Sequence, residues 1–325
     1  MSNESLRRGD WVEVRSPAEI LATLDERGML ENLPFMPEMA HFCGRRLRVD
    51  RRTERICDTV NYTGSLRLAD AVMLEDLRCD GSAHGGCQAS CRLIWKEAWL
   101  RRVDPNAPAA APGLQSTATL IARIASQVRH SDESAPAAEE LWRCQTTELL
   151  NAASSIPGLN LRSLLSELTT GNVSLGYFVR VMVRALLWEP WRKRTMLTSS
   201  GLLRGASVEP SGGQPLQLRP GEWVRVKSRA EIAATLSPTG HSRGLSFDRE
   251  MLPFCGKSLR VGQRITRIID ERTGRMLRIK ADVIALEHVV CSGECSARRL
   301  FCPRAIVPYW RECWLERIDP RNEPG

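Results

Sequence analysis

The chain has few aromatic residues, few histidines and no long hydrophobic run. Aromatic residues make up 6% of its 325 residues, and it has five histidines. No apolar run reaches the roughly 18 residues that a membrane-spanning helix needs, so no such helix is expected. The first ten residues, MSNESLRRGD, lack the apolar core of a secretory signal, and we therefore expect a cytoplasmic protein.

The usual sequence signatures of catalysis are also missing. We find no Gly-rich nucleotide loop, no nucleophile elbow, no pair of metal-hydrolase histidines and no dinucleotide-binding fingerprint. Because histidine is the side chain best suited to general-base chemistry near neutral pH, five histidines leave few carriers for it. These absences favour a binding or accessory role over an enzymatic one.

The sequence does contain an internal repeat. GDWVEVRSPAEILATLD (9–25) matches GEWVRVKSRAEIAATLS (221–237) at an offset of 212 residues, and this register is kept as far as Cys79 and Cys291. The second copy then carries three more residues, and WKEAWLRRVDP matches WRECWLERIDP at an offset of 215. We therefore predict a first Cys-rich repeat, an α-helical middle domain and a second Cys-rich repeat, over residues 1–104, 114–200 and 214–325.

Each repeat has the pattern of a small β module. Apolar and polar residues alternate in DWVEVRS, and a short helix is expected from Pro17, with Ser16 as its cap and Glu19 three residues later. We expect an α+β protein in which two small β-barrels are separated by a helical insert. The opening GDWVEV and the closing tryptophan strand resemble the SH3-like barrel, including the KOW-type modules of nucleic-acid-associated proteins. The resemblance covers about half of each repeat and implies a small closed barrel.

Eight of the eleven cysteines follow one plan, with one thiol early in each repeat and three late. In a reducing compartment, four thiols in each repeat predict a four-cysteine metal site, because an ion offsets the repulsion between gathered thiolates. We predict zinc at both sites, with an iron–sulfur cluster or merely buried thiols as the alternatives. The motif CDGSAH is similar to the CDGSH iron–sulfur signature with one residue inserted. The predicted ligands are Cys43, Cys79, Cys87 and Cys91 in the first repeat and Cys255, Cys291, Cys295 and Cys302 in the second.

Three further residues bear on these sites. His84 lies in the late loop of the first repeat, where it could replace one thiol. Glu38 and Glu250 recur at the 212 offset just before the early cysteine. A buried glutamate that accepts hydrogen bonds from backbone amides explains this recurrence as well as a catalytic acid does.

Other residues are candidates for contact with a partner. Trp99 and Trp314 recur, and they serve either core packing or an aromatic binding platform. Arg180 and Arg184 stand one turn apart in the apolar stretch over 174–194. That stretch is a core helix of the insert, a docking helix for a protein, or an interfacial helix that makes peripheral contact with a membrane.

The net charge of +8 is concentrated in the last third of the chain, where residues 221–325 hold 19 Lys and Arg against 13 Asp and Glu. The leading hypothesis is a metal-binding tandem-repeat accessory protein that binds a macromolecular partner, most simply another protein. One alternative is an iron–sulfur redox protein or enzyme component that acts on a small substrate. Another is nucleic-acid binding through the basic second repeat.

Overall fold

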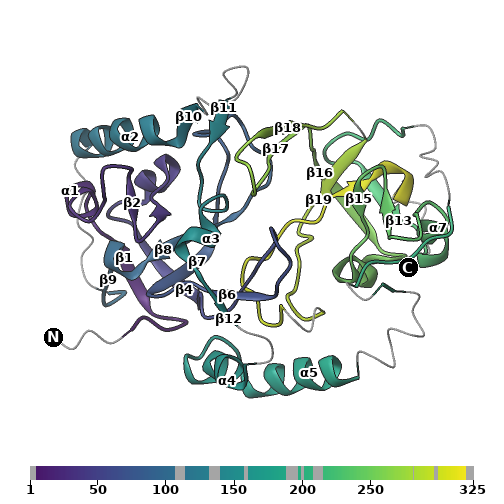
Figure 1. Ribbon diagram of the computed structural model, residues 1–325, viewed down its shortest axis with the longest axis horizontal. Coiled ribbons are helices and arrows are strands. Elements are labelled where there is room, and N and C mark those ends of the chain that lie inside the picture. The colour runs from purple at the N-terminus through teal and green to yellow at the C-terminus, as the bar shows by residue number, and fades with distance from the viewer. Residues whose placement is uncertain are drawn as a thin grey trace. The chain divides into compact units, whose positions relative to one another are not determined.

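The structure is a computed structural model that describes residues 5–106, 114–131, 140–156, 160–187, 197–198, 201–207, 215–280, 282–295 and 299–319. It confirms a mixed α+β fold, with many short antiparallel strands and few helices (Figure 1). The chain divides into two compact units: the first comprises 1–178, 267–277 and 301–304, and the second 179–266, 278–300 and 305–325. Residues 267–277 and 301–304 of the second repeat thus belong to the first unit.

The first unit is built on a five-stranded antiparallel sheet. Its strands β8 and β9 lie at opposite edges, yet only the three residues of the 3-10 turn η2 (Glu97–Trp99) join them. Three residues span at most about 10 Å, whereas the edges of a flat five-stranded sheet lie about 19 Å apart. The sheet must therefore curl into a half-barrel. From edge to edge the strands are β8 (Arg92–Lys96), β7 (Ala71–Arg78), β4 (Arg46–Arg52), β1 (Trp11–Val14) and β9 (Leu100–Arg102).

The second unit contains a sheet of the same strand order. Trp11 pairs with Arg48 in the first sheet and Trp223 with Arg260 in the second, so the pairing keeps the 212 offset. Both sheets also have a register shift at the corresponding place. The strands are β20 (Trp310–Arg311), β19 (Val283–Leu286), β16 (Ser258–Arg264), β13 (Trp223–Val226) and β21 (Leu315–Arg317), with η4 (Glu312–Trp314) between β20 and β21.

Local sequence explains the short elements around each sheet. The helix α1 (Pro17–Leu21) begins with the predicted capping box, in which Ser16 and Glu19 bond to each other's backbone N–H groups, and α7 (Arg229–Ala233) has the same box. The remaining elements of the repeats are β2 (Met29–Leu30), β3 (Leu33–Pro34), η1 (Pro37–Phe42), β5 (Ile56–Cys57), β6 (Ser65–Arg67), β14 (His241–Ser242), β15 (Leu245–Ser246), η3 (Arg249–Phe254), β17 (Arg267–Ile269) and β18 (Met276–Arg278).

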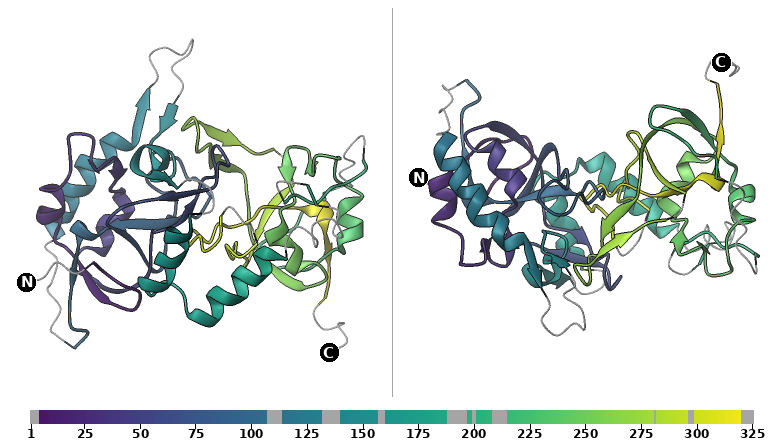
Figure 2. Two further views of the ribbon diagram at one scale, coloured as in Figure 1. Left: turned by 60° about the horizontal axis from the view of Figure 1, so that its bottom comes forward. Right: turned by 90° about the horizontal axis from the view of Figure 1, so that it is seen from above.

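The insert is only partly helical. The helix α2 (Leu114–Val128) packs on the core of the first unit through Leu120, Ile124 and Val128, as its spacing predicts (Figures 1 and 2). Within the insert, β11 (Glu140–Trp142) pairs with β10 (Arg129–Ser131), and the backbone N–H of Trp142 donates to the carbonyl of Gly274, so residues 140–142 are strand; residues 132–139 lie outside the described ranges. The other elements are α3 (Leu149–Ala152), β12 (Ser154–Ile156), α4 (Leu161–Thr169) and α5 (Leu175–Leu186).

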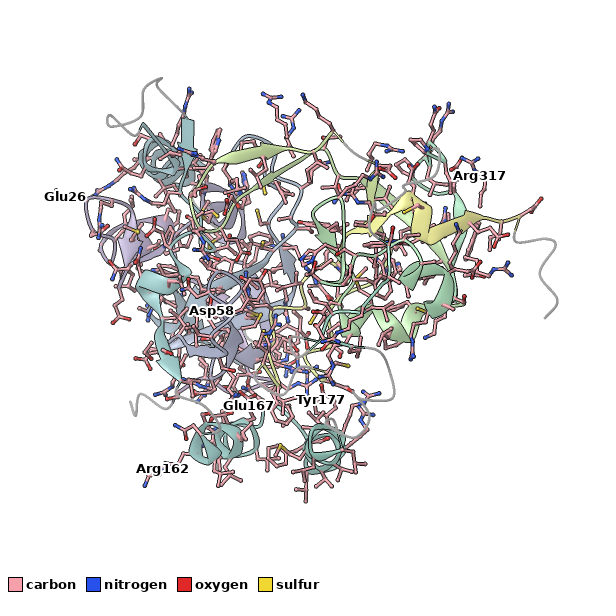
Figure 3. All side chains as sticks on the ribbon, turned by 45° about the vertical axis from the view of Figure 1, so that its right-hand side comes forward. Glu26, Asp58, Arg162, Glu167, Tyr177 and Arg317 are labelled. Atoms are coloured by element: carbon pink, nitrogen blue, oxygen red, sulfur yellow. The ribbon has the colours of Figure 1, made fainter. Side chains whose placement is uncertain are left out.

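A buried amide docks α4 on the first sheet. Asn172, which has no exposed surface, accepts a hydrogen bond from the backbone N–H of Arg52 (2.8 Å) and donates to its carbonyl (3.1 Å). The same amide donates to Glu167 on α4 at 2.9 Å. Glu167 is labelled in Figure 3. Burial raises the pKa of Glu167 to about 7, against an ordinary value of 4.5.

The hairpin β17–β18 of the second repeat completes the first unit through reciprocal contacts. Cys302 Sγ accepts a hydrogen bond from the backbone N–H of Cys57 (3.1 Å), and Cys87 Sγ accepts one from the backbone N–H of Ile269 (3.4 Å). Cys87 and Cys302 are equivalent in the repeat alignment, and so are positions 57 and 269. Each repeat thus offers a loop sulfur to the hairpin backbone of the other.

Two further contacts join residues to their own repeat equivalents. Thr59 bonds to Glu271 through its hydroxyl, and Arg272 donates to the carbonyl of Val60 at 2.6 Å. Both pairs are separated by 212 residues. Contacts between equivalent positions are typical of the isologous interface of a two-fold dimer. The hairpin β5–β6 of the first repeat and the hairpin β17–β18 of the second therefore contact each other as the two subunits of such a dimer would, although they belong to one chain.

The buried cation Arg304 holds this pairing in place. Its side chain is 6% exposed, and it donates to the carbonyl of Cys57 (3.1 Å), the hydroxyl of Thr59 (2.8 Å) and the carboxylate of Glu271 (2.9 Å). We expect Arg304→Ala to lower the free energy of unfolding by about 3 kcal/mol, because it leaves the carboxylate of Glu271 without its cation and the carbonyl of Cys57 without the arginine donor. Arg272→Ala is the matched control: its exposed side chain gives up one hydrogen bond, and the loss should stay below about 1 kcal/mol. Urea denaturation of both variants measures the difference, and equal losses would contradict the assigned role of Arg304.

Glu167 predicts a pH dependence of stability. Since its folded pKa is raised from 4.5 to about 7, the folded state binds the proton more tightly than the unfolded chain. The resulting stabilisation is full below pH 4.5 and is lost as the pH rises through 7, amounting to about 3 kcal/mol. The variant Glu167→Gln does not titrate at this position. The difference in free energy of unfolding between the variant and the natural chain should therefore shift in favour of the variant by about that amount between pH 4.5 and pH 8. Denaturation at both pH values measures it, and a stability difference that stays constant with pH would refute the prediction.

Candidate metal centre

A tight loop after β7 brings the residues of the candidate site together. Cys79 starts this loop, and the backbone N–H groups of His84 and Gly86 both bond to the carbonyl of Gly81 (3.1 and 2.9 Å). Gly81 has a φ of 73°, and a Cβ atom there would lie 2.0 Å from the carbonyl oxygen of Cys87. Only glycine fits such a turn, which folds His84 back onto Cys79.

Glu38 completes the site from the first turn of η1. Among the described residues, Glu38, Cys79 and His84 form the one group of three or more Cys, His, Asp or Glu residues whose ligand atoms all lie within 4.8 Å of one another. The Sγ atom of Cys79 lies 3.3 Å from Nε2 of His84. Glu38 and His84 are buried, at 6% and 2% exposure, and Cys79 is half-buried.

The surroundings disfavour charge on all three side chains. Neither carboxylate oxygen of Glu38 has a hydrogen-bond partner of normal geometry, although the Cys79 thiol lies beside it. Burial raises the pKa of Glu38, and burial together with the nearby Glu38 raises the pKa of Cys79. Burial lowers the pKa of His84 to about 4. A divalent cation reverses this preference, because it stabilises the carboxylate, the thiolate and the neutral imidazole at the same time.

The donor set suits zinc. Thiolate sulfur, imidazole nitrogen and carboxylate oxygen are the three ligand types that proteins offer to Zn²⁺, and three protein ligands leave one tetrahedral position open. A cavity of about 30 Å³ lies at the site, with Cys87, Cys91 and Cys144 among its lining residues. It has room for a single water molecule. Burial raises the pKa of Cys91 to about 12, so this thiol stays protonated at neutral pH.

The matching loop of the second repeat is built differently. Glu250 is the counterpart of Glu38, and its carboxylate accepts hydrogen bonds from Ser292 N (3.0 Å), Ser292 Oγ (2.7 Å) and Cys295 N (2.7 Å). In the repeat alignment His84 corresponds to Ser296 at the offset of 212 and to Arg299 at the offset of 215. The second repeat therefore has no histidine at this place. Glu250 is half-buried and accepts hydrogen bonds from two backbone N–H groups of its loop, as expected of a glutamate that caps backbone amides, whereas Glu38 does not.

The structure does not gather the predicted four-cysteine sets. Cys79 is the one predicted ligand in the metal-binding group, while Cys87 bonds to Ile269 and Cys91 lines the adjacent cavity. Cys43 caps the end of η1, and burial raises its pKa to about 11. In the second repeat, Cys302 lies in the first unit, whereas Cys255, Cys291 and Cys295 lie in the second unit. Sequence reasoning noted His84 and Glu38 separately, and a search for mixed N, O and S ligands around Cys79 could have joined them.

The two recurrent tryptophans pack in the cores. Trp99 and Trp314 have no exposed surface, and their indole N–H groups donate to the hydroxyls of Thr23 (3.1 Å) and Thr235 (2.9 Å). Each ring meets a phenylalanine edge to face, with centroids 5.0 and 5.2 Å apart. Because stacking on a ligand requires an exposed ring face, this burial favours the packing alternative.

The helix α5 carries the two singled-out arginines. Arg180 and Arg184 both pair with Glu294, at 2.8 and 2.7 Å. The helix leaves Leu175 and Val179 at least half exposed, which differs from the expected core helix. Residues 188–194 of the predicted membrane-contact stretch lie outside the described part of the chain. None of the helices in the described ranges has both the length and the apolar character that crossing a membrane demands.

Comparisons of this chain with protein-family models, with curated proteins and with solved structures found no match.

The two equivalent glutamates should respond oppositely to the same substitution. With a chelator present at pH 7, Glu250→Gln should lower the free energy of unfolding by about 2 kcal/mol, because the charged acceptor of three hydrogen bonds is lost. Glu38→Gln should change it by no more than about 0.5 kcal/mol, since no donor loses its partner there. Chemical denaturation of the full chain measures both. An equal cost at the two positions would show that Glu38 is satisfied by the protein itself.

Proposed function

We propose that this chain is a metal-binding accessory protein whose first repeat holds one zinc ion through Glu38, Cys79 and His84. The observation that carries the proposal is the buried carboxylate of Glu38, which lacks a hydrogen-bond donor of normal geometry and lies within 4.8 Å of a thiol and an imidazole. Burying an unpaired carboxylate is costly, and a bound cation removes that cost.

The ion would be structural for the first repeat. Glu38 belongs to η1, and Cys79 and His84 belong to the loop that follows β7, so one ion joins two segments separated by about 40 residues of chain. Metal binding of this kind contributes directly to folding. When bound, zinc supplies Lewis acidity at its open fourth position, and the three protein residues hold and orient it there.

The donor set supports zinc over the iron–sulfur alternative. Iron–sulfur clusters are held mainly by cysteine thiolates, usually four of them. The group at Glu38 provides a single thiolate, and the second repeat provides no comparable group among its described residues. We therefore propose one ion per chain in place of the two that the cysteine count predicts.

The sheets support a partner-binding role of the SH3-like kind. Each repeat has a sheet of five short antiparallel strands. If the strands of one sheet are numbered from one to five along the chain, their order across the sheet is five, one, two, three, four. A 3-10 turn joins the fourth strand to the fifth, as a small barrel requires. We propose that the two repeats are SH3-like half-barrels whose outer surfaces bind a protein partner.

Metal analysis tests the assignment. The full chain, purified with zinc in the medium and then dialysed, should hold one zinc per chain. Cys79→Ser and His84→Ala should each reduce this to below about a tenth, because losing one of three ligands costs several kcal/mol of binding. Cys291→Ser, the matched change in the second repeat, should keep one ion.

Thermal unfolding provides the second readout. Chelation should lower the Tm of the natural chain and of Cys291→Ser, and leave the Tm of Cys79→Ser unchanged. Zinc at two ions per chain, with loss of one in each cysteine variant, would support the four-cysteine sites instead. A zinc-free or brown protein would refute the proposed centre.

A further inference from the structure

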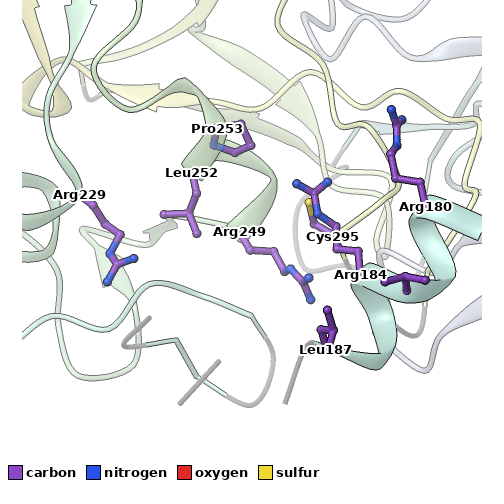
Figure 4. A pocket seen from close by; sticks show the side chains of 9 residues that line it. Arg180, Arg184, Leu187, Arg229, Arg249, Leu252, Pro253 and Cys295 are labelled. Carbon is purple, nitrogen blue, oxygen red and sulfur yellow. The ribbon is translucent and has the colours of Figure 1, made fainter. Parts of the chain in front are cut away.

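The second unit contains a large cavity that the proposed metal centre does not use. Its volume is about 640 Å³, within the range of roughly 300–1,000 Å³ that small-molecule sites occupy. It lies between α5, the start of α7, the 3-10 turn η3 and the loop at Cys295 (Figure 4). All nine residues that line it belong to the second unit.

The cavity is positively charged. Four of its nine lining residues are arginines, Arg180, Arg184, Arg229 and Arg249, and none of the nine is acidic. Arg180 and Arg184 both pair with the carboxylate of Glu294, which does not itself line the cavity. Arg229 forms no ion pair with a carboxylate among the described residues. Figure 4 shows that the four arginines come from three different elements.

The remaining wall is apolar. Val183 and Leu187 come from α5, and Leu252 and Pro253 come from η3. Val183 is 49% exposed and Leu187 is 61% exposed, so much of their apolar surface is open to solvent. Covering such surface with an apolar ligand removes it from water, at about 25 cal/mol per Å². Guanidinium groups, in turn, recognise carboxylates and phosphates through paired hydrogen bonds.

We infer that this cavity binds a single anionic amphiphile, with a carboxylate or phosphate head among the arginines and an acyl-type chain against Val183, Leu187 and Leu252. The ligand enters as a free molecule rather than as part of a bilayer, because the apolar residues line a concave cavity. This gives Arg180 and Arg184 the task of positioning an anion while Glu294 limits the local repulsion between them.

Calorimetric titration of the full chain tests the inference, with decanoate and decyl phosphate as probes below their micelle concentrations and 1-decanol as the neutral control. Either anion should bind with a stoichiometry of one per chain, and 1-decanol should bind at least tenfold more weakly, because it lacks the charge. Comparing the two anions distinguishes a carboxylate from a phosphate ligand. Binding of 1-decanol as tight as that of both anions would overturn the inference.

Three variants locate the site. Arg229→Ala should weaken anion binding about tenfold, the effect of one charge-assisted hydrogen bond. Arg225→Ala is the control, since Arg225 pairs with Glu316 at 2.7 Å and does not line the cavity. Val183→Trp should abolish binding by filling the cavity, and its half-exposed position lets the chain fold. Unchanged affinity in both Arg229→Ala and Val183→Trp would show that the ligand binds elsewhere.

Vesicles separate this site from a membrane-contact helix. Anionic phospholipid vesicles should bind the chain no better than neutral ones. If the chain binds anionic vesicles but no soluble amphiphile, the inference fails and the interfacial-helix prediction for 174–194 gains support. Zinc removal should leave amphiphile binding intact. The amphiphile test can therefore give a negative result while the metal test gives a positive one, and the reverse.

Discussion

The first unit depends on a reciprocal exchange of hydrogen bonds between hairpins and loop sulfurs. Cys302 accepts from the backbone of Cys57, Cys87 accepts from the backbone of Ile269, and Arg304 ties the pair together from a buried position. Cys87 ends the tight loop that carries His84, so the hairpin contact helps to hold that loop against Glu38. This arrangement explains why equivalent cysteines recur without forming a four-thiol site: the thiols at 87 and 302 serve as hydrogen-bond acceptors for the opposite repeat.

The two repeats share one sheet framework and differ in the chemistry of their loops. In the second repeat the carboxylate of Glu250 is neutralised by three donors from its own loop, and that loop is closed without an ion. In the first repeat Glu38 has no such donors, and Gly81 and His84 build a different turn beside it. A carboxylate withdrawn from water is stabilised by donors, by a cation or by a proton; Glu250 has the donors, and the zinc ion proposed above would be the cation for Glu38.

The two proposed sites use opposite electrostatics. The proposed metal centre gathers an acid, a thiol and an imidazole, and burial disfavours the charged form of each. A bound cation would instead favour the carboxylate and the thiolate. The cavity in the second unit is lined by four arginines and by no acidic residue, and an anion complements this lining. A protein with both would be stabilised by a metal in one unit and would bind a small amphiphile in the other. Neither role requires a nucleophile or a general base, in keeping with the few histidines of the chain.

The sequence by itself determined what depends on neighbouring residues. It predicted the capping box at Ser16 and Glu19, the packing face of α2 and the α+β class, because caps and periodicity are local. It also showed that Glu38 and Glu250 are equivalent. Only the tertiary structure decided that one carboxylate accepts three hydrogen bonds and the other has no partner of normal geometry, since this depends on a loop some 40 residues away and on three inserted residues. The exchange of hairpins and the division of the eight cysteines were likewise decided there, because contacts between positions 182 to 245 residues apart leave no periodic trace in the chain.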